Sequence, residues 1–207
     1  MRRVPAFLVA LRALAAPALL AAAARGAPGA ALAALVTLAL LSDVFDGVIA
    51  RRLGVATPAL RHADSVADAV FYLAALGALW MRARGAVTAL AAPLAALLAL
   101  EAVRLVLERA KYGRMAAYHM WSAKLWGLTL WLGVCEAFLA SAPAGARTDT
   151  AGPLLRLAVY VGLATDLEGL AATLVLPRWE CDVPTLWHAR QRARALAAAR
   201  AEDRRTA

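Results

Sequence analysis

Four aspartates lie close together in an otherwise apolar chain, within SDVFDGVIARRLGVATPALRHADSVAD (residues 42–68). They are Asp43, Asp46, Asp64 and Asp68. The first two are three residues apart and the last two are four apart, so each pair shares one face of a helix. A glycine and a proline between the pairs predict a turn. At 1.5 Å per residue, two antiparallel helices would hold all four carboxylates roughly 9 to 16 Å from that turn.

Four clustered carboxylates restrict which cations can bind them. A lone aspartate at the centre of a membrane helix costs about 2.5 to 3.5 kcal/mol on insertion scales, so a cluster needs counter-charge. Carboxylate oxygens without thiolates suit Mg²⁺ or Mn²⁺ rather than Zn²⁺. Two divalent ions would balance four carboxylates, and such a pair stabilises displacement at phosphorus. The alternative is a purely structural ion-pair cluster with Arg51, Arg52 and Arg61.

Small and basic residues accompany the first aspartate pair. Gly47 and Ala50 share its helix face, and their size would let a flat or bulky ligand approach the backbone. Arg51 follows directly and is placed to bind a phosphate. The stretch therefore predicts a site for metal ions and a phosphate-containing ligand.

The composition predicts a membrane protein. The 207 residues are 63% hydrophobic and 18% charged, and the mean hydropathy is +0.64. Soluble domains contain fewer apolar residues and more charged ones. Alanine and leucine favour helices over a barrel. Six stretches are long enough to cross a bilayer: 4–24, 29–50, 62–81, 85–106, 119–140 and 152–176. We expect an all-α, integral-membrane bundle of about six transmembrane helices.

The basic residues indicate how the chain is oriented. Most of the 23 lysines and arginines fall on the side of the N-terminus, so both termini, and the face bearing the aspartates, are predicted to be cytoplasmic. This distribution explains the net charge of +9 without nucleic acid. We expect a membrane domain over 1–176 and a basic amphipathic cytoplasmic tail over 177–207 at anionic headgroups. The first apolar stretch also resembles a secretory signal, which Arg12 interrupts.

The stretch DVFDGVIAR followed by DSVAD is similar to the signature of the CDP-alcohol phosphatidyltransferase family, D-x2-D-G-x2-A-R-x8-G-x3-D-x3-D. Every position matches except the second glycine, which is Leu60 here. The spacing across Leu60 is kept, so Asp64 and Asp68 stay in register. Two weaker similarities support it: VPAFLVALRALAAPAL resembles the family's opening segment, with Ala6 in place of its asparagine, and Lys124 matches the lysine of a later stretch.

The resemblance implies a membrane phosphotransferase of phospholipid biosynthesis. It would move a phosphatidyl or other substituted phosphate group from a CDP-alcohol to an acceptor alcohol and release CMP. The implied metal ligands, for two Mg²⁺ or Mn²⁺ ions, are Asp43, Asp46, Asp64 and Asp68. Asp68 would also be the general base, and the implied binding residues for the CDP group are Gly47, Ala50 and Arg51. A homodimer in a membrane is implied as well.

Several questions stay open. The small size and composition favour a bacterial inner membrane and CDP-diacylglycerol as the donor, whereas the acceptor is not readable. A small cation transporter is an alternative, although its acids would line the whole depth of the membrane. A catalytically impaired relative acting as a scaffold is another, because of Leu60. Glu101 and Arg104 are predicted to pair, and Asp166 and Glu168 to point apart. The roles of these four residues and of Lys124 are open.

Overall fold

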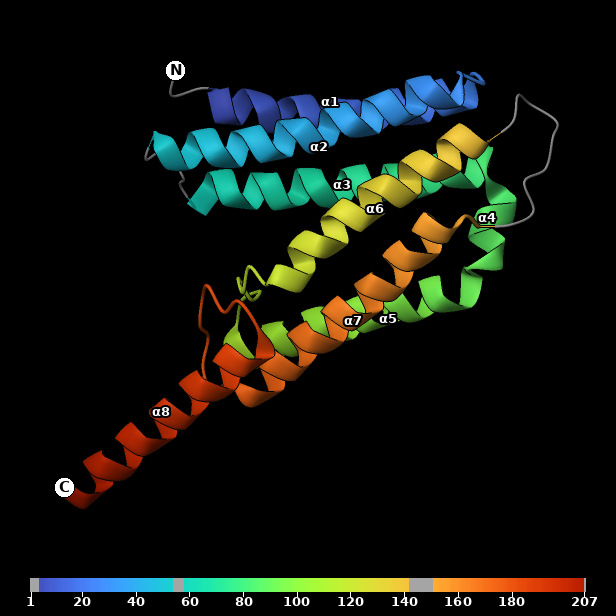
Figure 1. Ribbon diagram of the computed structural model, residues 1–207. Helices are drawn as coiled ribbons and strands as arrows, with labels where there is room; N and C mark the ends of the chain where they lie inside the picture. The colour runs from blue at the N-terminus through green and yellow to red at the C-terminus, as the bar shows by residue number, and fades with distance from the viewer. Residues whose placement is uncertain (1–3, 54–57, 142–150, 207) are drawn as a thin grey trace. The chain divides into compact units, whose positions relative to one another are not determined.

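The computed structural model describes residues 4–53, 58–141 and 151–206, with some side chains inside these ranges left out. Within them the chain is helical (Figure 1), apart from connecting segments and one isolated bridge between Ala117 and Cys181. The helices are α1 (Val4–Ala24), α2 (Gly29–Arg52), α3 (Pro58–Arg82), α4 (Arg84–Ala89), α5 (Ala91–Tyr112), α6 (Trp121–Ala140), α7 (Pro153–Val175) and α8 (Leu186–Thr206). The all-α prediction is confirmed for the described residues.

The helices divide into two compact units. Unit 1 comprises residues 1–90 and 131–155, and unit 2 comprises residues 91–130 and 156–207. Both α6 and α7 contribute residues to each unit. The two units are therefore described one at a time.

Unit 1 is built on α1, which packs against both α2 and α3 (Figure 1). Small and medium-sized apolar residues of these helices are buried, among them Ala16, Leu19, Leu32 and Ala78. Alanine favours the helix and lets helix backbones approach closely in a membrane protein. Gly29 shows how close the approach is, because a Cβ there would collide with the backbone carbonyl of Phe138 in α6.

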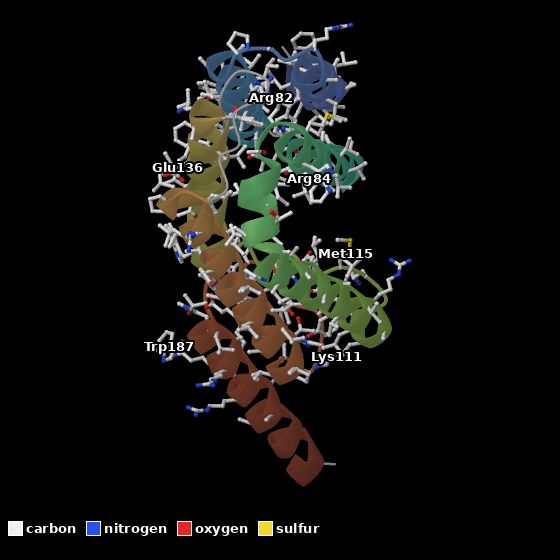
Figure 2. All side chains as sticks on the ribbon, turned by 90° about the vertical axis from the view of Figure 1, so that its right-hand side faces the viewer. Arg82, Arg84, Lys111, Met115, Glu136 and Trp187 are labelled. Atoms are coloured by element: carbon white, nitrogen blue, oxygen red, sulfur yellow. The ribbon has the colours of Figure 1, made fainter. Side chains whose placement is uncertain are left out.

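The connections in unit 1 are fixed by polar side chains. Arg82, at the end of α3, donates a hydrogen bond to the carbonyl of Ala27 over 2.6 Å, which ties α3 to the turn between α1 and α2 (Figure 2). Glu136 of α6 accepts hydrogen bonds from the amides of Leu154 and Leu155, at 3.0 and 3.1 Å. These amides belong to the first turn of α7, where backbone N–H groups have no partner within the helix.

The predicted stretch 85–106 is not one helix. The chain leaves α4 at Leu90 and restarts as α5 at Ala91. Pro93 explains the interruption, since it has no amide hydrogen and its ring would clash with the carbonyl of Ala89, four residues earlier. Pro93 is tolerated in the first turn of α5, where its missing N–H would be unpaired anyway.

Unit 2 contains α5, α8 and most of α7. Its core includes Tyr118 and Met120 from the segment before α6, together with Ala172, Leu176, Val183 and Ala189. Lys111 donates to the carbonyls of Thr173 and Leu174, at 2.6 and 3.1 Å, and so caps the end of α7 (Figure 2). A cation there complements the negative end of the helix dipole.

Three helices are long and apolar enough to cross a membrane, among the residues that the structure describes. They are α6, α7 and the part of α1 from Phe7 to Ala24. Among the described residues, α2 contributes a shorter apolar stretch, Gly29–Phe45. Several apolar helices together indicate an integral membrane protein, while the number of six spans and the cytoplasmic termini stay predictions. The predicted boundary at residue 176 between a membrane domain and a tail also stays a prediction.

Candidate metal centre

Three of the four aspartates converge in unit 1. Asp43 comes from α2, and Asp64 and Asp68 lie one turn apart on α3. One carboxylate oxygen from each lies within 4.8 Å of the others. Their side chains are partly exposed, at 42% for Asp43 and 33% for each of the other two. The predicted meeting of the two aspartate-bearing helices is therefore seen for these three residues.

An arginine from a third helix lies among these carboxylates. Arg12 of α1 is only 2% exposed, and its Nη2 lies 3.2 Å from Asp43 Oδ1. Its Nη1 donates a hydrogen bond to Asp64 Oδ1 at 2.9 Å and another to Asp68 Oδ1. The guanidinium group thus bridges all three helices. It is a cation beside the aspartates in addition to the three arginines, Arg51, Arg52 and Arg61, that the sequence suggested.

The remaining predicted site residues have no described side chain. Asp46, Gly47, Ala50 and Arg51 all belong to α2, but their side chains lie outside the part that the structure describes. The same is true of Arg61. The roles assigned to these residues therefore stay predictions.

The three carboxylates fit a hard divalent cation. Magnesium and manganese prefer oxygen ligands, and the donor atoms of this group are carboxylate oxygens. Their mutual separation allows them to face one ion after small side-chain adjustments. The same carboxylates already hold one cationic group, the guanidinium of Arg12. The geometry and the charge of the group both suit a metal.

A second polar cluster lies in unit 2. Arg104 of α5 contacts Glu101 at 2.8 Å and Glu108 at 3.5 Å on its own helix, and Asp166 of α7 at 2.9 Å. The predicted pairing of Glu101 with Arg104 is confirmed. Asp166 is 1% exposed and Glu108 4%, whereas Arg104 is 24% and Glu101 40% exposed. Sequence analysis did not connect Glu108 or Asp166 with this arginine.

Two other residues with open roles have structural partners. Glu168 accepts a hydrogen bond from the amide of Leu186 at 2.9 Å, in the first turn of α8. Since Asp166 binds Arg104 instead, the prediction that these two acids point apart is confirmed. Lys124 lies with its Nζ 4.2 Å from the ring centroid of Trp121, a cation–π contact on α6.

The family model for CDP-alcohol phosphatidyltransferase matches residues 2–174. The chain belongs to this family. No curated protein and no solved structure matches it. CDP-alcohol phosphatidyltransferases are phosphotransferases for substituted phosphate groups and use a divalent metal. The chain is accordingly an enzyme of this kind, with a CDP-alcohol as donor and an alcohol as acceptor. Helix α8 lies beyond the matched residues.

The residue that sequence analysis missed is Arg12. From the sequence it was noted as a charge that interrupts an apolar stretch and as part of the segment that resembles the family's opening. A buried arginine in a membrane helix is costly without a partner, so its presence predicts a carboxylate nearby. Sequence alone does not say which one, because the partners are 31 to 56 residues away.

Proposed function

We propose that this phosphotransferase moves a phosphatidyl group from CDP-diacylglycerol to an acceptor alcohol, with release of CMP, at the cytoplasmic face of a membrane. The convergence of Asp43, Asp64 and Asp68 carries the proposal, because it gathers carboxylates from two helices into one group. Bound Mg²⁺ or Mn²⁺ ions would supply positive charge to the phosphates and to the leaving oxygen. We assign the ligand role to these three residues and to Asp46.

The reaction forms one bond to phosphorus and breaks another. The acceptor oxygen bonds to the phosphorus that carries the diacylglycerol, the bond from that phosphorus to the CMP oxygen breaks, and CMP leaves. The hydroxyl proton of the acceptor goes to Asp68, which acts as the general base. Such a base must lie within hydrogen-bond reach of the hydroxyl. Partial exposure of Asp68, at 33%, is compatible with contact to a substrate.

The donor would be held beside the aspartates by α2. Gly47 and Ala50 would let the nucleotide approach the helix, and Arg51 would pair with a phosphate through its planar guanidinium. The proposal places the CDP group between the metal ligands of α2 and those of α3. A lipid donor suits a protein whose helices expose large apolar side chains, such as Phe7, Leu14 and Leu73.

The direct test measures CMP release by the purified protein in detergent. CDP-diacylglycerol is supplied with Mg²⁺ or Mn²⁺ and with glycerol phosphate, inositol phosphate, serine or a simple alcohol, one acceptor at a time. Soluble CDP-alcohols replace the lipid donor in a second series. Metal-dependent CMP release with one acceptor would establish the donor and name the product. Removing the base typically costs about 100- to 10,000-fold, which is the loss expected for Asp68→Asn.

The matched control is Asp182→Asn, the same chemical change at a carboxylate that is 76% exposed and lies outside the aspartate group. It should leave CMP release near the wild-type level. If Asp68→Asn lost donor binding as much as turnover, Asp68 would not be the base. Folded protein that released no CMP from any donor would favour the scaffold alternative.

A further inference from the structure

Arg12 stands out because it binds the same three carboxylates that could hold a metal ion. Its guanidinium contacts Oδ1 of Asp43, Asp64 and Asp68, one oxygen from each carboxylate of the candidate metal centre. The group carries three negative charges and one positive charge in the described residues.

A guanidinium and an ion cannot share these oxygens freely. Magnesium binds oxygen at about 2.0 to 2.1 Å, closer than any hydrogen bond. The Nη1 of Arg12 already lies 2.9 Å from Asp64 Oδ1 and also bonds Asp68 Oδ1. An ion among the same oxygens would be repelled by the adjacent positive charge, and in a site of low dielectric this repulsion is strong.

Arg12 also holds the helices together. It is 2% exposed on α1, and its two terminal nitrogens reach α2 and α3. Without a cation, three carboxylates this close would repel one another and drive α2 from α3. The fork of the guanidinium suits this task, since it offers several donors in fixed directions.

We propose that Arg12 is a built-in counter-ion, which holds Asp43, Asp64 and Asp68 together and is displaced from their oxygens when a divalent ion binds. Arg12 thereby lowers the affinity for the metal while it keeps the ligands close together before the metal arrives. It is a positioning residue in this role and does not touch the reacting atoms. The inference rests on the proposed metal centre.

The test titrates the purified protein in detergent with Mn²⁺ and measures the remaining free ion by electron paramagnetic resonance. The midpoint of thermal unfolding is measured as well. In Arg12→Gln we expect Mn²⁺ affinity to rise about tenfold or more, because the competing charge is gone. The midpoint without Mn²⁺ should fall, and added Mn²⁺ should raise it more than in the wild type, since tighter binding stabilises more. Weaker Mn²⁺ binding by Arg12→Gln would overturn the proposal.

A conservative variant covers the case in which Arg12→Gln does not fold. Arg12→Lys keeps the charge but has one nitrogen, so it cannot reach both α2 and α3 as the fork does. Its Mn²⁺ affinity should be higher than that of the wild type, and equal or lower affinity would overturn the proposal. The matched control is Arg104→Gln, which removes an arginine from the carboxylate cluster of unit 2. It should lower the midpoint and leave Mn²⁺ affinity unchanged.

The outcomes distinguish failure of the counter-ion role of Arg12 from failure of the metal centre itself. Wild-type protein should bind Mn²⁺, and Asp64→Asn should weaken that binding. If the wild type bound none, the metal centre and the role of Arg12 would both fail. If binding depended on Asp64 but weakened in the Arg12 variants, the metal centre would stand and only the counter-ion role would fail.

Discussion

Among the described residues, each unit contains an arginine that contacts three carboxylates, and the two clusters differ in where these carboxylates lie. In unit 1, oxygens from α2 and α3 gather within 4.8 Å, and the side chains are about one-third exposed or more. In unit 2, Glu101 and Glu108 lie on α5 on either side of Arg104, and Asp166 reaches it from α7.

The carboxylates of unit 2 contact Arg104, and one of them has a second partner in the protein. Glu108 accepts a hydrogen bond from the amide of Ala116 at 2.8 Å in addition to its contact with Arg104. Gly169 leaves room for the arginine, since a Cβ there would meet its Nη1 at 3.1 Å. Among the described residues, only the aspartates of unit 1 form a group that could hold a metal. The unit 1 cluster is a candidate metal site because its carboxylate oxygens converge and its aspartates are partly exposed. The unit 2 cluster is a structural network.

The largest difference is expected in activity. Asp64→Asn should lower CMP release by more than about 100-fold, because even residues that only support metal ligands typically cost roughly 10- to 100-fold. Asp166→Asn makes the same change in unit 2 and should cost far less activity. Comparing CMP release per folded protein for the two variants checks this. Equal losses would break the distinction between the clusters.

The second difference is expected in stability. Arg104→Met leaves carboxylates without their cation, two of them buried, and should lower the free energy of unfolding by about 3 kcal/mol. The control is Arg178→Met, which breaks the exposed pair with Glu180 and should cost less than about 1 kcal/mol. Denaturant unfolding in detergent measures both. A small loss for Arg104→Met would show that the unit 2 cluster is not the structural one.

The helix packing within each unit gives a third, smaller effect. Gly29→Ala in unit 1 would drive a methyl group into the backbone of α6 at Phe138, and overpacking of this kind costs about 1 to 3 kcal/mol. Gly127→Ala in unit 2 meets nothing within 4 Å, and it should be neutral or stabilise by up to about 1 kcal/mol, as alanine favours a helix. The midpoints of thermal unfolding of the two variants, measured under the same conditions, test this difference in stability. Loss of stability in Gly127→Ala instead would contradict the difference in packing.

The smallest effect is expected at the departure from the family signature. Leu60 lies on α3 one turn before Asp64, where the family has glycine. Leu60→Gly should raise CMP release by a few-fold if the leucine narrows the approach to the aspartates, at a cost of about 1 kcal/mol in helix stability. Initial rates over a range of donor concentrations measure the gain. An unchanged rate would show that Leu60 does not limit access to the unit 1 site.

Local sequence signals predicted much of the fold. The expected stretches 4–24, 119–140 and 152–176 differ from α1, α6 and α7 by two residues at most. Runs of alanine and leucine ended by glycine and proline set these bounds. The break at Leu90 was missed although Pro93 was in view, because a proline in a membrane helix often leaves the helix intact, as Pro17 does in α1.

The sequence by itself determined the family, the helical class and the pairing of the aspartates on two helix faces, because each depends on residues a few positions apart. Tertiary structure alone decided which cation those aspartates face. Arg12 reaches them only because α1 packs against both α2 and α3. Tertiary structure also assigned Asp166 to Arg104, a contact across 62 residues. Periodicity fixes which face of a helix a charge occupies, whereas the charge that neutralises it depends on which helices pack together.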